Sequence, residues 1–264
     1  MSFLEIEYRE QQMTWNMAKL QSHDFYEIYY LLEGERTFFI KDKTFTLQKN
    51  SIVVISPFQM HKTEGGAYKR VNVYISADLL DENERKFLNA CSSLIAFQLD
   101  PAKKNTFLAL LKPFFTKASK DDSLKQKYTL AFAKALLCTL QSATLKPLSV
   151  SPKSPVQNDS KAVILQVVAY INQHFQEDIS LDRLKDVFFL SKNTLCKNFQ
   201  RVMNCSVMEY CSKVRLSKAK HLLLTTDKSM EDIADLCGYS SANYFSLLFK
   251  SKTGIAPSHY RKKK

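Results

Sequence analysis

The stretch SMEDIADLCGYSSANYFSLLFKSKTGIAPSHY, residues 229–260, decides how the C-terminal part of this chain folds. Ser229 is a good helix N-cap, and Gly238 supplies the left-handed residue at which a short helix ends. Ser240 or Ser241 then caps a second helix, whose apolar residues recur at helical spacing. Two short amphipathic helices joined by a tight turn predict a helix-turn-helix, whose second helix is suited to a DNA major groove.

A related pattern occurs earlier in the chain, in residues 180–210. Asn204 aligns with Gly254, and Asn is the residue that best tolerates the left-handed conformation after Gly. Phe189 aligns with Gly238, so we expect the first turn to be built differently from the second. A single helix-turn-helix pattern is hard to tell from an ordinary pair of packed helices. Its repetition favours a DNA-binding interpretation.

Residues 207–224, between the two units, contain no Pro or Gly and predict a continuous helix. A helix of this length is a rod of ~27 Å. Successive major grooves on one side of DNA lie ~34 Å apart. The rod can therefore hold two recognition helices near the separation of adjacent grooves.

These features together resemble a known protein family. The two helix-turn-helix units, the linking helix, the run of residues 215–261 and the basic C-terminal end are similar to the AraC/XylS family of bacterial transcription regulators. In that family each recognition helix enters one of two adjacent major grooves. The resemblance implies double-stranded DNA as a partner, and it makes RNA polymerase a further candidate partner.

The resemblance also implies, by position, which side chains meet the DNA. The residues expected to face the bases, in chain order along the two recognition helices, are Asn193, Cys196, Lys197, Asn243, Ser246 and Leu247. Gln200 and Lys250 are better placed for phosphates. The family often has Arg at the position of Leu247, so we expect contact with a thymine methyl group there rather than with guanine.

The charge of the chain is concentrated in this C-terminal part. The formal net charge is +12, and residues 161–264 contribute +8 of it, from 17 Lys and Arg against 9 Asp and Glu. An excess of positive charge is what attraction to phosphates requires.

The six cysteines form no CxxC pair, and most fall at helical or core positions, so buried thiols are expected. Cys196 is the exposed candidate. The N-terminus has no apolar signal segment, and no apolar run approaches the length of a membrane span. We therefore expect a cytoplasmic protein with no membrane contact.

Residues 1–80 predict β-structure, with short strands separated by turn signals, one of them at residues 33–35. Such spacing is typical of a β-sandwich or barrel. The pattern then turns helical up to residue 143, and a segment rich in Pro and Ser follows. The expected fold is α+β in two domains. They are a cupin-like β-sandwich or barrel with trailing helices in residues 1–145 and, after a linker at 146–160, an all-α DNA-binding domain in 161–264.

The arrangement of HDFYE, then a β-meander, then PFQMH resembles the cupin-type sensor domain that commonly precedes this DNA-binding unit. It implies an effector pocket whose candidate residues are His23, Tyr26, Glu27 and His61. Further aromatic residues that could line the pocket are Tyr29, Tyr30, Phe38 and Phe58. Three N and O ligands could hold a divalent metal. Metal-binding cupins usually have another His where this chain has Gln21, however, so we expect a pocket without a catalytic metal and no cofactor.

Residues 123–143 form the strongest predicted helix, with a broad apolar stripe. A helix this apolar needs a partner. Packing on its own β-domain is the default, and the family resemblance implies a homodimer through this helix.

Two functions follow from these observations. The favoured one is a transcription regulator, expected to be an activator and not an enzyme, which responds to a small-molecule effector of which a sugar is one candidate class. The alternative is a cupin metalloenzyme or metal sensor, with metal at His23, Glu27 and His61 and an accessory DNA-binding module. Gln21 weakens that alternative.

Overall fold

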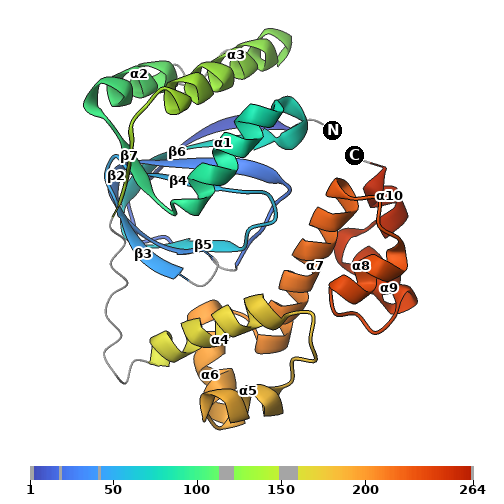
Figure 1. Cartoon of the computed structure of the whole chain (residues 1–264). Coiled ribbons are helices and arrows are strands. Elements are labelled where there is room, and N and C mark those ends of the chain that lie inside the picture. Colours follow the sequence, from blue (N-terminus) through green and yellow to red (C-terminus); the bar gives the residue numbers. More distant parts are fainter. Residues whose placement is uncertain (1–2, 18–19, 41–42, 113–121, 149–159, 263–264) are drawn as a thin grey trace.

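The computed structural model describes residues 3–17, 20–40, 43–112, 122–148 and 160–262. Two antiparallel sheets with helices on one outer face precede an all-helical part, as the sequence predicts (Figure 1). Most of the linker predicted at 146–160 lies outside the described residues.

The long strand β2 belongs to both sheets. Its first half pairs with β4 and β6, and its second half pairs with β3 and β5. β1 extends the first sheet beyond β6, and β7 and β8 extend it beyond β4. The strands are β1 (Leu4–Gln11), β2 (Phe25–Ile40), β3 (Lys43–Gln48), β4 (Ile52–Ile55), β5 (His61–Glu64), β6 (Tyr68–Ser76), β7 (Phe97–Leu99) and β8 (Leu145–Pro147).

The turn predicted at residues 33–35 is wrong, because β2 continues through this point. Its register with β6 shifts between Leu31 and Glu33. Gly34 has a φ of 89° there, and its backbone lies so close to Ala67 that any side chain would clash. The bulge at Leu32 and the left-handed Gly34 therefore bend one strand from the first sheet into the second, rather than reversing the chain between two strands.

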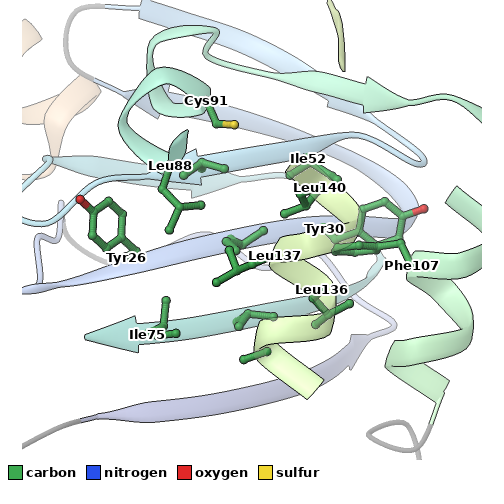
Figure 2. Close-up of a cluster of buried hydrophobic side chains, with 14 of the residues drawn as sticks. Tyr26, Tyr30, Ile52, Ile75, Leu88, Cys91, Phe107, Leu136, Leu137 and Leu140 are labelled. Carbon is green, nitrogen blue, oxygen red and sulfur yellow. The ribbon is translucent and has the colours of Figure 1, made fainter. Parts of the chain in front are cut away.

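Three helices cover the outer face of the first sheet: α1 (Glu82–Ser93), α2 (Pro101–Leu111) and α3 (Asp122–Gln141). In Figure 2, Leu136, Leu137 and Leu140 of α3 lie over the sheet beside Tyr30. The default expectation that α3 packs on its own β-domain is confirmed, through the face that carries Ala133, Leu136, Leu137 and Leu140. The phase of the expected stripe is wrong in part, because Tyr128, Ala131 and Cys138, which helical spacing placed on it, are exposed. The homodimer through α3 remains a prediction.

The second part of the chain contains both expected helix-turn-helix units. Their helix pairs are α5–α6 and α8–α9, and α7 joins them. With 19 residues, α7 is a rod of about 28 Å. The helices are α4 (Ser160–His174), α5 (Leu181–Phe188), α6 (Lys192–Met203), α7 (Val207–Thr225), α8 (Met230–Leu236), α9 (Ala242–Thr253) and α10 (Pro257–Arg261).

The two turns are more alike than the sequence suggests. Phe189 adopts the left-handed conformation, with a φ of 52°, just as Gly238 does with a φ of 74°. The expectation of a differently built first turn is therefore wrong. The Phe189 side chain is 93% exposed, so it meets no packing conflict, and its N–H donates to the carbonyl of Lys185. At the second turn Ser241 caps α9 by accepting from the Tyr244 N–H at 3.2 Å.

The backbone of residues 175–177, which follows α4, ties the two helix-turn-helix units together. Arg215 of α7 donates from Nε to the carbonyl of Phe175 at 2.6 Å and from Nη2 to that of Glu177 at 2.8 Å. Gly238 comes so close to the same segment that a methyl group on it would lie 2.6–2.8 Å from backbone atoms of Gln176. Gly238 thus serves both the turn and the packing between the units.

Two glycines with similar backbone conformations should respond differently to substitution. Gly254 has a φ of 81° and open space around its Cα, so Gly254→Ala should lower the free energy of unfolding by about 1 kcal/mol through backbone strain alone. Gly238→Ala should cost more, because the backbone at Gln176 must also move. Urea unfolding followed by helical circular dichroism measures both costs, and equal costs would contradict the close approach of Gly238 to Gln176.

Candidate DNA-recognition faces and effector cavity

Helix α6 presents one polar face to solvent. Leu195, Phe199 and Met203 are buried and fix the rotation of the helix. The residues predicted to meet DNA all lie on the opposite, exposed side, namely Asn193, Cys196, Lys197 and Gln200. The structure therefore brings this predicted set together on one face.

Helix α9 repeats the arrangement. Phe245 and Phe249 are buried, and Phe245 lies edge-on to Phe249 with ring centroids 5.6 Å apart. On the other side Asn243 and Lys250 are exposed, Leu247 is 72% exposed, and Ser246 is half-buried. An apolar side chain this exposed on a recognition helix has no packing role, which fits contact with an apolar base edge.

One exposed side chain on α9 was missed in the sequence. Tyr244 is 52% exposed, directly beside Asn243. Its ring also lies against that of Tyr239 in the turn, with centroids 6.4 Å apart. The sequence did carry a signal for its exposure: Tyr244 is the third residue of α9 and does not fall on the helical face of the buried Phe245 and Phe249.

In the β-domain the structure brings three of the four predicted effector residues together. His23 Nε2 lies 3.0 Å, and His61 Nε2 3.5 Å, from the same oxygen of Glu27. His23 donates its Nδ1–H to the carbonyl of Phe25 at 2.8 Å, and His61 donates its Nδ1–H to that of Gln59 at 3.0 Å. Both rings are therefore held so that Nε2 points at one carboxylate.

Burial and neighbouring groups set the charges of this cluster. Burial opposes ionisation of Glu27, but the hydrogen bond from His23 and the charges of His61, His23 and Arg70 outweigh it, so the pKa of Glu27 is lowered. For His61, burial lowers the pKa, and the charge of Glu27 only partly offsets this effect. The cluster offers two imidazole nitrogens and one carboxylate oxygen, and these atoms lie within 4.8 Å of one another. Such a set can bind a hydroxyl or amino group of a ligand, or a divalent cation.

The fourth predicted residue, Tyr26, does not join them. Successive residues of a strand point to opposite faces, and Tyr26 lies on the face covered by the helices (Figure 2). Its hydroxyl donates to Asn89 at 3.1 Å. Tyr30 lies on that same face. Phe58 is also absent from the wall of the cavity between the sheets, and its ring lies near His221 of α7.

A cavity of about 350 Å³ opens between the two sheets, and Glu27 and His61 form part of its wall. The rest of the wall comes from β1, β2, β5, β6 and the segment after β1. The lining includes the aromatic residues Trp15, Tyr29, Phe38, Tyr68 and Tyr74. Burial raises the pKa of Tyr74 to about 12, so its hydroxyl keeps its proton and can donate a hydrogen bond.

Several buried polar atoms on this wall have no hydrogen-bond partner among the residues that the structure describes. They are Tyr29 Oη, Tyr68 Oη, Arg70 Nη1 and Asn72 Oδ1. A buried polar atom without a partner costs about 1–3 kcal/mol. Sequence patterns could not reveal this set, because it combines residues from β2 and β6 that meet only in the folded sheet. The arrangement offers hydroxyl and guanidinium donors, and acceptors, to a polar molecule.

No helix in the described part of the chain is both long and apolar enough to span a membrane.

Comparisons with known proteins match both parts of the chain. The family model of an AraC-like ligand binding domain matches residues 3–129, and that of a helix-turn-helix domain matches residues 184–263. The HTH-type transcriptional activator RhaS of Enterobacter sp. (strain 638) is 26% identical over 90% of this chain and 86% of its own length. The bifunctional transcriptional activator/DNA repair enzyme AdaA of Bacillus subtilis (strain 168) is 34% identical over 42% of this chain and 52% of its own.

Among solved structures, ToxT from Vibrio cholerae is 12% identical over 98% of this chain and 97% of its own, with a TM-score of 0.37. The two family models match in the order in which the cavity and the helix-turn-helix units follow one another along the sequence. This chain is a DNA-binding transcription regulator that responds to an effector, and it belongs to the AraC family.

Proposed function

We propose that this regulator is an activator whose effector is a small, polar, hydroxyl-rich molecule bound in the cavity between the two sheets. The observation that carries this proposal is the set of unpartnered buried polar atoms on the cavity wall. Within a domain that matches a ligand-binding model, such atoms are where a ligand would supply the missing hydrogen bonds.

The chemistry of the wall favours a sugar or a similar compound. Hydroxyls of Tyr29 and Tyr68, a guanidinium nitrogen of Arg70 and an amide oxygen of Asn72 can pair with ligand hydroxyl groups. Aromatic rings beside them offer flat apolar surfaces to the carbon skeleton. The cluster of His23, Glu27 and His61 would bind a further polar group.

We also propose how the chain meets its other partners. Exposed residues of α6 and α9 would read bases in adjacent major grooves, with Gln200 and Lys250 on phosphates. A homodimer, contact with RNA polymerase and a cytoplasmic location belong to this proposal, as do the domain limits 1–145 and 161–264. Activation is proposed because RhaS and AdaA are both named as activators.

We propose that the chain is not an enzyme. AdaA is described as a bifunctional activator and repair enzyme, but it aligns with less than half of this chain. The RhaS relative, which aligns with nearly all of it, is described only as an activator.

Asn243→Ala should cost about 1–3 kcal/mol of specific binding and relax the preference at one base position, because an Asn side chain can make two hydrogen bonds to one base. The measurement is selection of preferred duplexes from random sequences by the wild type and the variant, followed by affinity titrations. If binding to all sequences weakens equally, Asn243 does not read a base.

Lys250→Ala should weaken binding to every sequence and reduce the slope of log affinity against log salt by about one, because one phosphate contact is lost. Lys146→Ala, which removes an exposed lysine of β8 at the edge of the first sheet, is the matched control and should leave the slope unchanged. A slope equal to that of the wild type in Lys250→Ala would remove this residue from the phosphate contacts.

Tyr29→Phe tests the cavity. Because the hydroxyl has no partner, its removal should leave the free energy of unfolding unchanged or raise it by up to about 1 kcal/mol. Thermal-shift screening of the wild type against sugars, sugar alcohols, aromatic acids and divalent metal salts should yield a stabilising compound. The shift caused by that compound should fall in Tyr29→Phe.

The control is the neighbouring Tyr30→Phe. Tyr30 lies on the opposite face of β2, and its hydroxyl donates to Asn50 at 3.2 Å. This variant should lose about 1 kcal/mol of stability and keep the full ligand-induced shift. Equal loss of the shift in both variants, or no stabilising compound at all, would count against the cavity as the effector site.

A further inference from the structure

Two short segments of the β-domain, residues 20–24 and 56–61, form one unit, which we call the docking loops. Gln21 and His61 exchange two backbone hydrogen bonds, of 3.0 and 2.9 Å. The Phe58 N–H donates to the carbonyl of His23 at 2.6 Å. A displacement of one segment must therefore move the other.

On one side the docking loops form part of the effector cavity. Gln21 and His61 line it, and His23 is joined to the cavity residue Glu27 through Nε2. A ligand that pairs with Glu27 or His61 would compete with or extend these bonds. Such a change would reach the backbone of the loops through a single side chain.

On the other side the docking loops touch the DNA-binding part of the chain. Ser217 of α7 donates from Oγ to the carbonyl of Phe58, and the Phe58 ring lies near that of His221, also on α7, with centroids 5.9 Å apart. Tyr260 of α10 donates to Asp24 at 3.4 Å. A second cavity, of about 390 Å³, lies between residues 20–23 of the loops and α7, and Gln21 lines it as well as the effector cavity. The wall between the effector cavity and α7 is thus one segment thick.

The backbone of the docking loops is held in a conformation that the sequence alone does not favour. Phe58 has a φ of 63°, in the left-handed region that a bulky residue seldom adopts. Its N–H and its carbonyl are both bonded across segment boundaries, to His23 and to Ser217. Loss of either bond would free this residue to return to an ordinary conformation.

We propose that the docking loops transmit the occupancy of the effector cavity to α7, the helix that spaces the two recognition helices. Resting on the effector site proposed above, this inference adds the route of regulation. The signal passes from Glu27 and His61 to the backbone at His23 and Phe58, and from there through Ser217 to α7. Asp24 and Tyr260 form a second, parallel contact to α10.

Coupling between two binding sites is reciprocal, so the route can be tested without knowing the effector. A duplex selected by the wild-type chain from random sequences serves as the probe. Binding of this duplex to the full chain should change amide hydrogen exchange in residues 20–24 and 56–61 by about fivefold or more. In Ser217→Ala the duplex should still bind, and the change in exchange should be lost or strongly reduced.

Two further variants sharpen the test. Ser212→Ala makes the same chemical change on α7 at a residue that has no hydrogen bond to the docking loops, and it should behave as the wild type. Asp24→Asn weakens the second contact and should reduce the change in exchange without affecting the fold.

Tight duplex binding with no change of exchange in the docking loops would overturn the proposed route, as would a full change that persists in Ser217→Ala. Neither result would touch the effector cavity itself, which stands or falls with the thermal-shift screen and Tyr29→Phe.

Discussion

Hydrogen bonds from α7 to the backbone of residues 175–177 fix the relative position of the two helix-turn-helix units. Arg215 places its guanidinium against the carbonyls of Phe175 and Glu177. Gly238 brings the turn of the second unit against Gln176 from another direction. Charge-assisted hydrogen bonds are stronger than neutral ones, and close backbone packing leaves little freedom to slide. The distance between α6 and α9 depends on this contact, and with it the pair of grooves that we propose they reach.

Strand β2 connects the two sheets of the sensor part, as α7 connects the two helix-turn-helix units of the DNA-binding part. Its alternation sends Tyr26, Ile28 and Tyr30 to the core beneath the helices and leaves Glu27 and Tyr29 to the cavity. The bulge at Leu32 and the left-handed Gly34 then carry the same strand into the second sheet, which closes the other side of the cavity. One strand thus supplies a rigid apolar support and the polar wall that this support holds in place.

The sensor part and the DNA-binding part contact each other at the docking loops. Leu20 and Met60, at the docking loops, belong to the same apolar cluster as the core of the first helix-turn-helix unit, whereas the core of the second unit is a separate cluster. The unequal attachment means that a shift of the loops would act first on α7 and the unit around α6. Because the docking loops both line the effector cavity and contact α7, few residues lie between a bound ligand and the DNA-binding part.

The sequence by itself determined the elements with strong local signals. The serine caps, the repeat of two helix pairs and the unbroken helix between them follow from side-chain spacing and from backbone preferences of single residues. So do most of the β-strands, but not the continuity of β2 through residues 33–35. The polar faces of α6 and α9 follow from the same spacing. It also placed His23, Glu27 and His61 in one site through resemblance to a known arrangement.

Only the tertiary structure decided the rest, because it depends on residues that are far apart in the chain. Gly34 could end a strand or continue it until β6 was seen to pair up to Gly34 and β3 from Glu35 onward. Phe189 could take a glycine-like conformation because nothing packs against its exposed ring. Tyr26 does not line the predicted site, because it lies on the face of β2 that packs in the core beneath the helices. The unpartnered atoms of the cavity and the contact between Ser217 and Phe58 exist only where separate segments meet.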